Sequence, residues 1–250
     1  MSIVLVVVCV IALFIYFEVL LQASRFLHGA RAVKAVDRYC DSVVARIFSL
    51  LRTYCAFEIV YEDRLGPDLP ERFILVANHQ SLLDIPLCMR MIAGRRLRFV
   101  AKKELGAGIP FVSSVLRTQG HALITRKGDT AQAMGAIRRF ARRSRREGTC
   151  PVLFPEGTRS RDGKLGPFYT AGLRKVLEEG PLPLVVAAID GGWRIAKLKD
   201  LYKSFRGIRY ELRLAAVLPA PSGKKETLEA LAAARDIISS ELADMRAASA

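Results

Sequence analysis

Two side chains that could transfer a proton lie five residues apart in the segment VANHQSLLDIP, residues 76–86: His79 and Asp84. A neutral imidazole can accept the proton of a hydroxyl group near neutral pH. A carboxylate that binds the other ring nitrogen fixes the tautomer and stabilises the imidazolium that forms. Alternatively, Asp84 caps a helix and His79 is an ordinary loop residue, because Pro86 belongs in the first turn of a helix. The spacing alone leaves both interpretations open.

A second polar cluster, FPEGTRSRDG at residues 154–163, follows another short apolar run. Gly157 allows a tight turn, and the backbone amides around it could bind an anion. Arg159 and Arg161 carry forked donors that match the oxygens of a phosphate group. The alternative is a charged surface turn without a ligand.

Further cations follow two other apolar runs. Lys103 and Arg126 are each expected just past a strand, at the edge of the sheet that carries His79. The sequence has no Gly-x-Ser-x-Gly segment, which argues against a serine nucleophile and a covalent intermediate. A His–Asp pair without a nucleophile suits direct attack by the hydroxyl group of an acceptor on an activated acyl group.

Strands and helices must alternate to position these groups. Short apolar runs predict strands at 55–61, 72–77, 97–101, 121–125, 151–154 and 184–189. Helical patterns separate several of them, notably at 85–93 and 129–147. Continuous apolar strands joined by helices predict an α/β fold with a mainly parallel, mixed sheet flanked by helices. Residues 209–218 begin with strict alternation and are expected to form an edge strand, and 224–246 predict an amphipathic helix.

The chain begins with an apolar segment, residues 3–21, which contains one charge, Glu18. A helix of about 20 apolar residues crosses a bilayer. There is no Lys or Arg before Arg25, unlike in a cleaved signal peptide, so a retained, membrane-embedded helix is expected. It either spans the membrane or enters one leaflet. The basic residues that follow predict that the rest of the chain lies on the cytoplasmic face of the cytoplasmic (inner) membrane.

Residues 36–52 form a second helical pattern with one apolar face and a basic face. A basic amphipathic helix beside a membrane anchor suits an anionic lipid surface, and a helix packed on the main domain explains the pattern equally well. We therefore expect an N-terminal anchor and amphipathic helix over 1–52 and a main domain over 53–250.

The composition predicts acidic partners. The net charge is +15 in 250 residues, of which 51% are hydrophobic, and six Arg occur within 138–146. Nucleic acid would explain only the charge, because no aromatic stacking platform or reader motif accompanies it. Anionic membrane lipid is the better partner because the chain also carries an anchor. The five cysteines form no CxxC pair and indicate neither a disulfide framework nor a metal site.

Four segments occur together and in order: N-H-x4-D at 78–84, K-x-E-L with a later Arg at 103–126, F-P-E-G-T-R-S at 154–160, and an apolar strand ending in Gly at 185–191. In this combination the chain resembles the glycerolipid acyltransferase family, which includes the bacterial 1-acylglycerol-3-phosphate acyltransferases. The resemblance covers residues 70–195, about half of the chain.

The resemblance implies roles for individual residues. It makes His79 the general base and Asp84 its partner. It makes Lys103, Arg126 and Arg159 candidates for binding the phosphate of the acceptor. The acceptor site is further expected to contain Glu156, Gly157 and Thr158.

The resemblance also implies a reaction. An acyl group passes from acyl-CoA or acyl-ACP (acyl carrier protein) to the free hydroxyl of 1-acylglycerol-3-phosphate, which gives phosphatidate, with no metal or other cofactor. One alternative is the same chemistry on another lysolipid, such as a lyso-ornithine lipid. Another is a non-enzymatic, basic peripheral membrane protein that binds anionic lipid. The chain departs from the pattern of many members at Leu82, Ser113 and Val186, which leaves the acceptor and the length of the acyl chain open.

Overall fold

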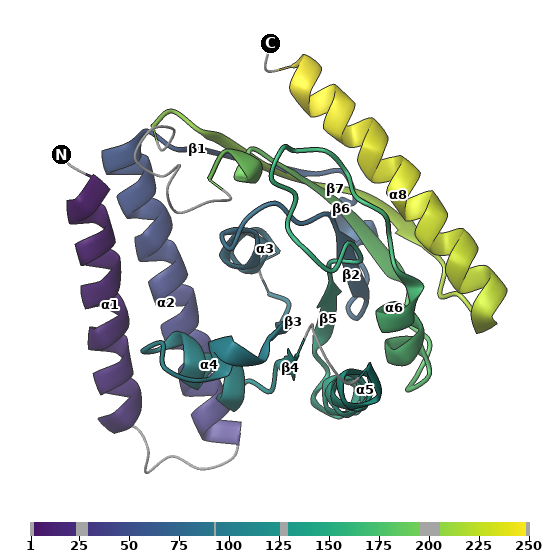
Figure 1. Cartoon of the computed structure of the whole chain (residues 1–250), viewed down its shortest axis with the longest axis horizontal. Coiled ribbons are helices and arrows are strands. Elements are labelled where there is room, and N and C mark those ends of the chain that lie inside the picture. The colour runs from purple at the N-terminus through teal and green to yellow at the C-terminus, as the bar shows by residue number, and fades with distance from the viewer. Residues whose placement is uncertain (1–2, 24–29, 93, 126–129, 196–205, 249–250) are drawn as a thin grey trace.

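A computed structural model of the chain describes residues 3–23, 30–92, 94–125, 130–195 and 206–248 (Figure 1). In these residues seven strands form one sheet, in the order β1-β7-β6-β2-β5-β3-β4. The strands are β1 (Glu58–Asp63), β2 (Ile74–Ala77), β3 (Leu97–Lys102), β4 (Ala122–Ile124), β5 (Cys150–Leu153), β6 (Leu184–Asp190) and β7 (Arg209–Leu218). The helices are α1 (Ile3–Ala23), α2 (Ala30–Cys55), α3 (Asp84–Met91), α4 (Val112–Thr118), α5 (Thr130–Glu147), α6 (Thr170–Leu177) and α8 (Gly223–Ala247).

The sheet is mixed and mainly parallel, which confirms the predicted fold class. Neighbouring strands are parallel except β6 and β7, which are antiparallel. Helices α1 to α4 cover one face, and α5, α6 and α8 cover the other (Figure 1). Within β2, Leu75 and Ala77 point to the first face, while Ile74 and Val76 point to the second.

The prediction that residues 209–218 form an edge strand is wrong. Strand β7 lies between β1 and β6, and β1 is at the edge. Two of the alternating charged side chains of β7, Glu211 and Arg213, are buried and pair with each other and with α8: Arg213 lies 3.0 Å from Glu211 and 2.8 Å from Glu241. The alternation of charged and apolar residues therefore reflects ion pairs beneath a helix. A strand with one face in water shows the same alternation.

The first two helices lie side by side against the main domain (Figure 1). Helix α2 buries Val36, Val43 and Ile47 in the same core as the sheet. Its apolar face is therefore packed on the protein, as the second of the two interpretations of residues 36–52 expected. It ends at Cys55, three residues past the expected boundary, and Ala56 turns the chain into β1 with a φ of 51°. The division of the chain at residue 52 stays a prediction.

Helix α1 presents an apolar surface outward. By length and composition it is long enough to cross a membrane over Val4–Ala23. Eight large apolar side chains on it are exposed: Val4, Leu5, Val7, Val8, Ile11, Ile15, Tyr16 and Val19. Its one acidic residue, Glu18, faces the protein and accepts hydrogen bonds from Phe111 N–H (2.9 Å) and the Ser114 hydroxyl (3.0 Å). The charge in the apolar segment thus connects α1 to α4.

Candidate active site

His79 lies two residues beyond β2, and its side chain is almost completely buried. Its Nδ1 atom lies 2.6 Å from Oδ2 of Asp84, the first residue of α3. Because a carboxylate accepts hydrogen bonds, Nδ1 carries the ring proton and Nε2 keeps a free electron pair. The structure thus brings together the two side chains that the sequence singled out, with Nε2 as the basic atom.

Asp84 does not cap its helix. The N-cap of α3 is Leu83, which has no side-chain cap bond. Instead, Asp84 Oδ2 accepts the backbone N–H groups of Gln80 (2.6 Å) and Ser81 (2.8 Å) as well as the imidazole. The carboxylate therefore turns back onto the preceding loop, where these donors stabilise its negative charge. The cap interpretation of Asp84 is wrong, although the helix does begin at this residue.

Glu156 fixes the backbone of His79. Its Oε1 accepts the N–H of His79 (2.8 Å), and its Oε2 accepts the N–H of Gly166 (2.9 Å). On the other side, the His79 carbonyl accepts the N–H of Ser160 (2.7 Å). Burial raises the pKa of Glu156, and the two amide bonds act against that rise. The FPEGTRS segment thus holds the loop of the base through main-chain bonds.

An aromatic ring supports the imidazole. Phe154, directly after β5, stacks on His79 with ring centroids 4.2 Å apart and an angle of 13° between the planes. Phe99 of β3 stacks behind Phe154 at 6.4 Å. These rings limit the rotation of the imidazole, so Nδ1 stays turned toward Asp84.

Side-chain amides fasten the loop after β2 to the end of β6. The Asn78 amide both donates to and accepts from the backbone of Ile189, each at 2.8 Å. Gln80 donates to Asp190 (3.1 Å) and accepts from the N–H of Trp193 (3.3 Å). Asn78 therefore has a positioning role that its place beside His79 in the sequence does not reveal.

Tyr210 is a site residue that the sequence did not indicate. It is fully buried on β7, 126 residues beyond Asp84, and its hydroxyl donates a hydrogen bond to Asp84 Oδ1. Burial and the charge of Asp84 raise the pKa of Tyr210, so the phenol stays protonated. The available signal was general: a tyrosine on the buried face of a strand needs a partner for its hydroxyl.

Two of the cations expected to bind phosphate, Lys103 and Arg159, follow strands at the same carboxyl ends of the sheet as His79, over a wider area. Lys103 follows β3, which is two strands from β2. At a spacing of about 4.8 Å between neighbouring strands, β3 therefore lies roughly 10 Å from β2, the strand that precedes His79. Gly157 has a φ of 65°, and Thr158 and Arg159 follow it, exposed and half-buried respectively. Arg126 lies outside the described residues. The roles of these residues stay predictions.

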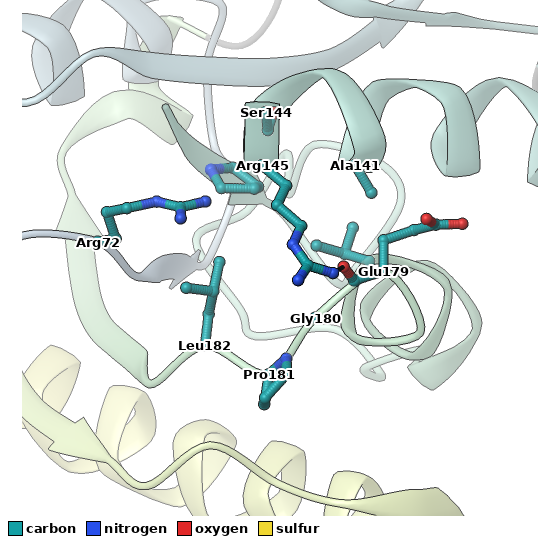
Figure 2. A pocket seen from close by; sticks show the side chains of 10 residues that line it. Arg72, Ala141, Ser144, Arg145, Glu179, Gly180, Pro181 and Leu182 are labelled. Carbon is teal, nitrogen blue, oxygen red and sulfur yellow. Dashed lines mark hydrogen bonds between the residues drawn. The ribbon is translucent and has the colours of Figure 1, made fainter. Parts of the chain in front are cut away.

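A hollow of about 190 Å³ lies at the amino ends of the strands, on the opposite side of the sheet from His79 (Figure 2). Arg72, before β2, and Arg145, on α5, border it together with Glu179 and Leu182. Arg145 donates to the Glu179 carbonyl (2.6 Å), and the Glu179 carboxylate pairs with Arg142 (2.8 Å). Part of the arginine run of α5 is therefore bound by the protein's own groups, away from His79.

His121 has a structural role. Its Nδ1 accepts the N–H of Phe99 (2.9 Å), so Nε2 carries the proton and bonds to Gln119 (2.8 Å). Gln119 in turn donates to Asp37 of α2 (2.7 Å). Burial, and to a smaller extent the charge of Arg98, lower the pKa of His121 to about 3. This histidine stays neutral and connects α2 to the sheet.

A model of the Acyltransferase family matches residues 61–190, just over half of the chain. The chain belongs to the Acyltransferase family. The matched range contains His79, Asp84 and the FPEGTRS segment, whereas Tyr210 lies outside it.

Curated relatives match between about half and two thirds of this family member. A 1-acyl-sn-glycerol-3-phosphate acyltransferase from Cocos nucifera is 33% identical over 131 residues, 51% of this chain and 41% of its own length. Its namesake from Haemophilus influenzae is 31% identical over 145 residues, 57% of this chain and 58% of its own. The 1-acyl-sn-glycerol-3-phosphate acyltransferase from Escherichia coli K12 is 27% identical over 172 residues, which are 69% of this chain and 67% of its own length. The chain thus spans about half the length of the first two relatives.

A solved structure has the same fold. The crystal structure of the 1-acyl-sn-glycerophosphate (LPA) acyltransferase PlsC from Thermotoga maritima superposes with a TM-score of 0.70, at 24% identity and over 96% of both chains. The likeness extends beyond the family region to the N-terminal helices and the C-terminal part. It shows that the whole architecture, and not only the family region, recurs in a known protein.

Proposed function

We propose that this family member transfers an acyl group from an acyl thioester to the free hydroxyl of 1-acylglycerol-3-phosphate and so forms phosphatidate. The observation that carries the proposal is the His79–Asp84 pair, 2.6 Å apart at the carboxyl edge of the sheet, with Nε2 as the basic atom. The names of the curated relatives support this acceptor.

In the proposed mechanism, His79 Nε2 accepts the proton of the acceptor hydroxyl while the oxygen attacks the thioester carbonyl. The C–O bond forms, and a tetrahedral intermediate carries the negative charge. When the intermediate collapses, the C–S bond breaks, and the thiolate takes the proton from the imidazolium. Asp84 stabilises the imidazolium between these two steps. The products are the diacyl lipid and the free thiol, and His79 returns to its neutral form.

The acceptor's phosphate is assigned to the cations at the same edge. Arg159 follows Gly157 in the turn after β5, and its forked donors match a phosphate monoester. Lys103 and Arg126 complete the proposed set. The donor is acyl-CoA or acyl-ACP, and no resident metal or other cofactor takes part in the proposed reaction. Among the described residues there is no cluster of three or more His, Cys, Asp or Glu side chains that could hold a metal ion.

The proposed site of action is the cytoplasmic face of the cytoplasmic membrane. The exposed apolar surface of α1 supports contact with the lipid interior. Anionic lipids are proposed as further partners because the net charge is +15.

The decisive test is an assay of the purified protein in detergent with matched acceptors and both thioester donors. Lysophosphatidate, a lysophospholipid with a larger head group and a lyso-ornithine lipid are compared at equal concentration, and the acylated products are measured. Phosphatidate formation at the highest kcat/KM supports the proposal. Faster turnover of another lysolipid would transfer the proposal to that acceptor. No turnover with any acceptor, combined with binding to anionic vesicles, would favour the non-enzymatic alternative.

A further inference from the structure

The Asp84 carboxylate is held at both of its oxygens. Oδ2 faces His79 Nδ1 and two backbone N–H groups, and Oδ1 accepts the hydroxyl of Tyr210. The tyrosine comes from β7, the one strand that is antiparallel to its neighbour β6, and its side chain is completely buried. The partner of the base is therefore positioned by a distant part of the chain.

The turn after β6 lies in close contact with this hydrogen bond. A Cβ atom at Gly192 would lie 2.9 Å from the Tyr210 hydroxyl oxygen and 3.1 Å from Asp84 Oδ1. At Gly191, whose φ is 90°, a Cβ atom would lie 2.0 Å from the carbonyl oxygen of Arg209. The two glycines thus let the backbone close over the Tyr210–Asp84 pair, and no space remains there for another side chain.

The groups around the carboxylate leave Tyr210 as a fixed donor. Burial and the Asp84 charge raise the pKa of Tyr210 and that of the Cys88 thiol on α3, so both stay protonated. The charge of Glu156, on the loop after β5, also interacts with Asp84 and His79. Both carboxylate oxygens of Glu156 accept hydrogen bonds from backbone amides. Asp84 and Glu156 are thus two charges that act on His79.

We propose that Tyr210 is a positioning residue for the proton transfer: its hydroxyl orients the Asp84 carboxylate toward His79 and takes up part of its negative charge. This inference rests on the proposed function. A carboxylate that loses one donor acts more strongly on its remaining partner, the imidazole. Without the tyrosine hydroxyl the imidazolium is therefore stabilised more, and His79 is neutral only at higher pH.

The test is Tyr210→Phe, which removes the hydroxyl and keeps the ring. A hydrogen bond to a charged group is strong enough that kcat should fall roughly tenfold, with a small change in the KM of the acceptor. In addition, the acid limb of the kcat/KM profile should move to higher pH. A ring that only fills space would leave this limb unchanged.

A matched control is Tyr61→Phe on β1. Tyr61 also has an aspartate partner, Asp63, but it is exposed at the edge of the sheet, away from His79. Its rate and its pH profile should equal those of the unmodified protein. A second disturbance of the same bond is Gly192→Ala, which crowds the hydroxyl without deleting it and should shift the profile in the same direction.

A titration that needs no turnover separates the two proposals. The imidazole of His79 is followed by NMR in histidine-labelled protein and assigned by the loss of its signal in His79→Gln. A raised pKa of His79 in Tyr210→Phe supports the inference, even if no acceptor is turned over and the proposed function fails. An unchanged titration and an unchanged pH profile in folded Tyr210→Phe overturn it. If Tyr210→Phe does not fold, the same titration of Gly192→Ala decides.

Discussion

At the scale of single residues, the imidazole ring of His79 has few orientations open to it. Phe154 stacks on His79, Asp84 binds its Nδ1, and Glu156 binds its backbone N–H. Side chains of α3 and of the loop after β5 thus hold the ring and its backbone, which keeps Nε2 in one place. In the proposed mechanism the contribution of the site is thus mostly orientation, from which much of the benefit of a general base arises.

His79→Ala should lower turnover by about a hundredfold to ten-thousandfold while the fold survives. Asp84→Asn should also be impaired, because an amide cannot stabilise the imidazolium and favours the wrong tautomer. The measurement is kcat with lysophosphatidate, together with the melting temperature of each variant. Normal activity in folded His79→Ala would contradict the mechanism.

Arg159→Ala should reduce kcat/KM for lysophosphatidate by roughly tenfold to a hundredfold, because a hydrogen bond to a charged group contributes about 1.5–3 kcal/mol. The KM of the thioester donor should change little. Arg174→Ala, an exposed arginine on α6, is the matched control. Equal losses on lysophosphatidate and on an acceptor without a phosphate monoester would show that Arg159 is structural.

His121 predicts a pH dependence of stability. Its pKa is about 3 in the folded protein and near 6.5 in an unfolded chain, so between these values only the unfolded state binds the proton. The free energy of unfolding should therefore decrease as the pH falls from about 6.5 toward 3, by at most about 1.4 kcal/mol per pH unit. Melting temperatures in detergent at several pH values measure this. In His121→Gln the melting temperature should be lower and its pH dependence weaker; an equal slope in both proteins would exclude His121 as the cause.

At the scale of the elements, the sequence predicts those strands and helices that a local pattern of residues encodes. The seven strands and the start of α3 follow from apolar runs and from Pro86. The position of β7 was missed because burial of paired charges and exposure to water give the same alternation. Tyr210 was missed for a related reason: its contact with Asp84 joins residues 126 apart, and no local spacing records it.

The link between α1 and α4 gives a prediction about stability. Phe111 has a φ of 61°, a strained conformation for a residue with a side chain, and its N–H is bound by Glu18. Glu18→Ala should lower the free energy of unfolding by about 1.5–3 kcal/mol, because the carboxylate holds this backbone in place. Thermal unfolding in detergent measures the effect. Glu229→Ala, on the exposed side of α8, should leave the melting temperature unchanged.

At the scale of the whole molecule, one apolar surface faces away from the protein. The buried side of α1, which includes Phe17, packs on the main domain, whereas Val8 and Ile15 point outward. A helix with both a packed side and an apolar outer side is suited to lying in lipid beside its own domain. Deleting the helix would disturb both sides, so substitutions on the outer side are the cleaner experiment.

The double substitution Val8→Lys and Ile15→Lys should move the protein from the membrane pellet toward the soluble fraction, because charges in the hydrocarbon region are costly. Residual binding through the basic surface should weaken as salt is added. The control is Leu228→Lys, which places the same charge on an exposed apolar position of α8. Full retention of the double variant in the pellet at high salt would contradict the anchoring role of α1.

The place of β7 in the sheet has a consequence for biosynthesis. Strand β1, near the start of the main domain, pairs with β7, which leaves the ribosome some 150 residues later. Until then β1 has no sheet neighbour, and Asp84 lacks the hydroxyl of Tyr210. The emerging chain therefore contains α1, His79 and Asp84 long before Tyr210 can reach Asp84, and the groups that fasten the His79 loop, from Glu156 to Trp193, emerge in between. A protein truncated directly before residue 210 should thus keep α1 and its membrane binding but be catalytically impaired, because it lacks the Tyr210 hydrogen bond to Asp84.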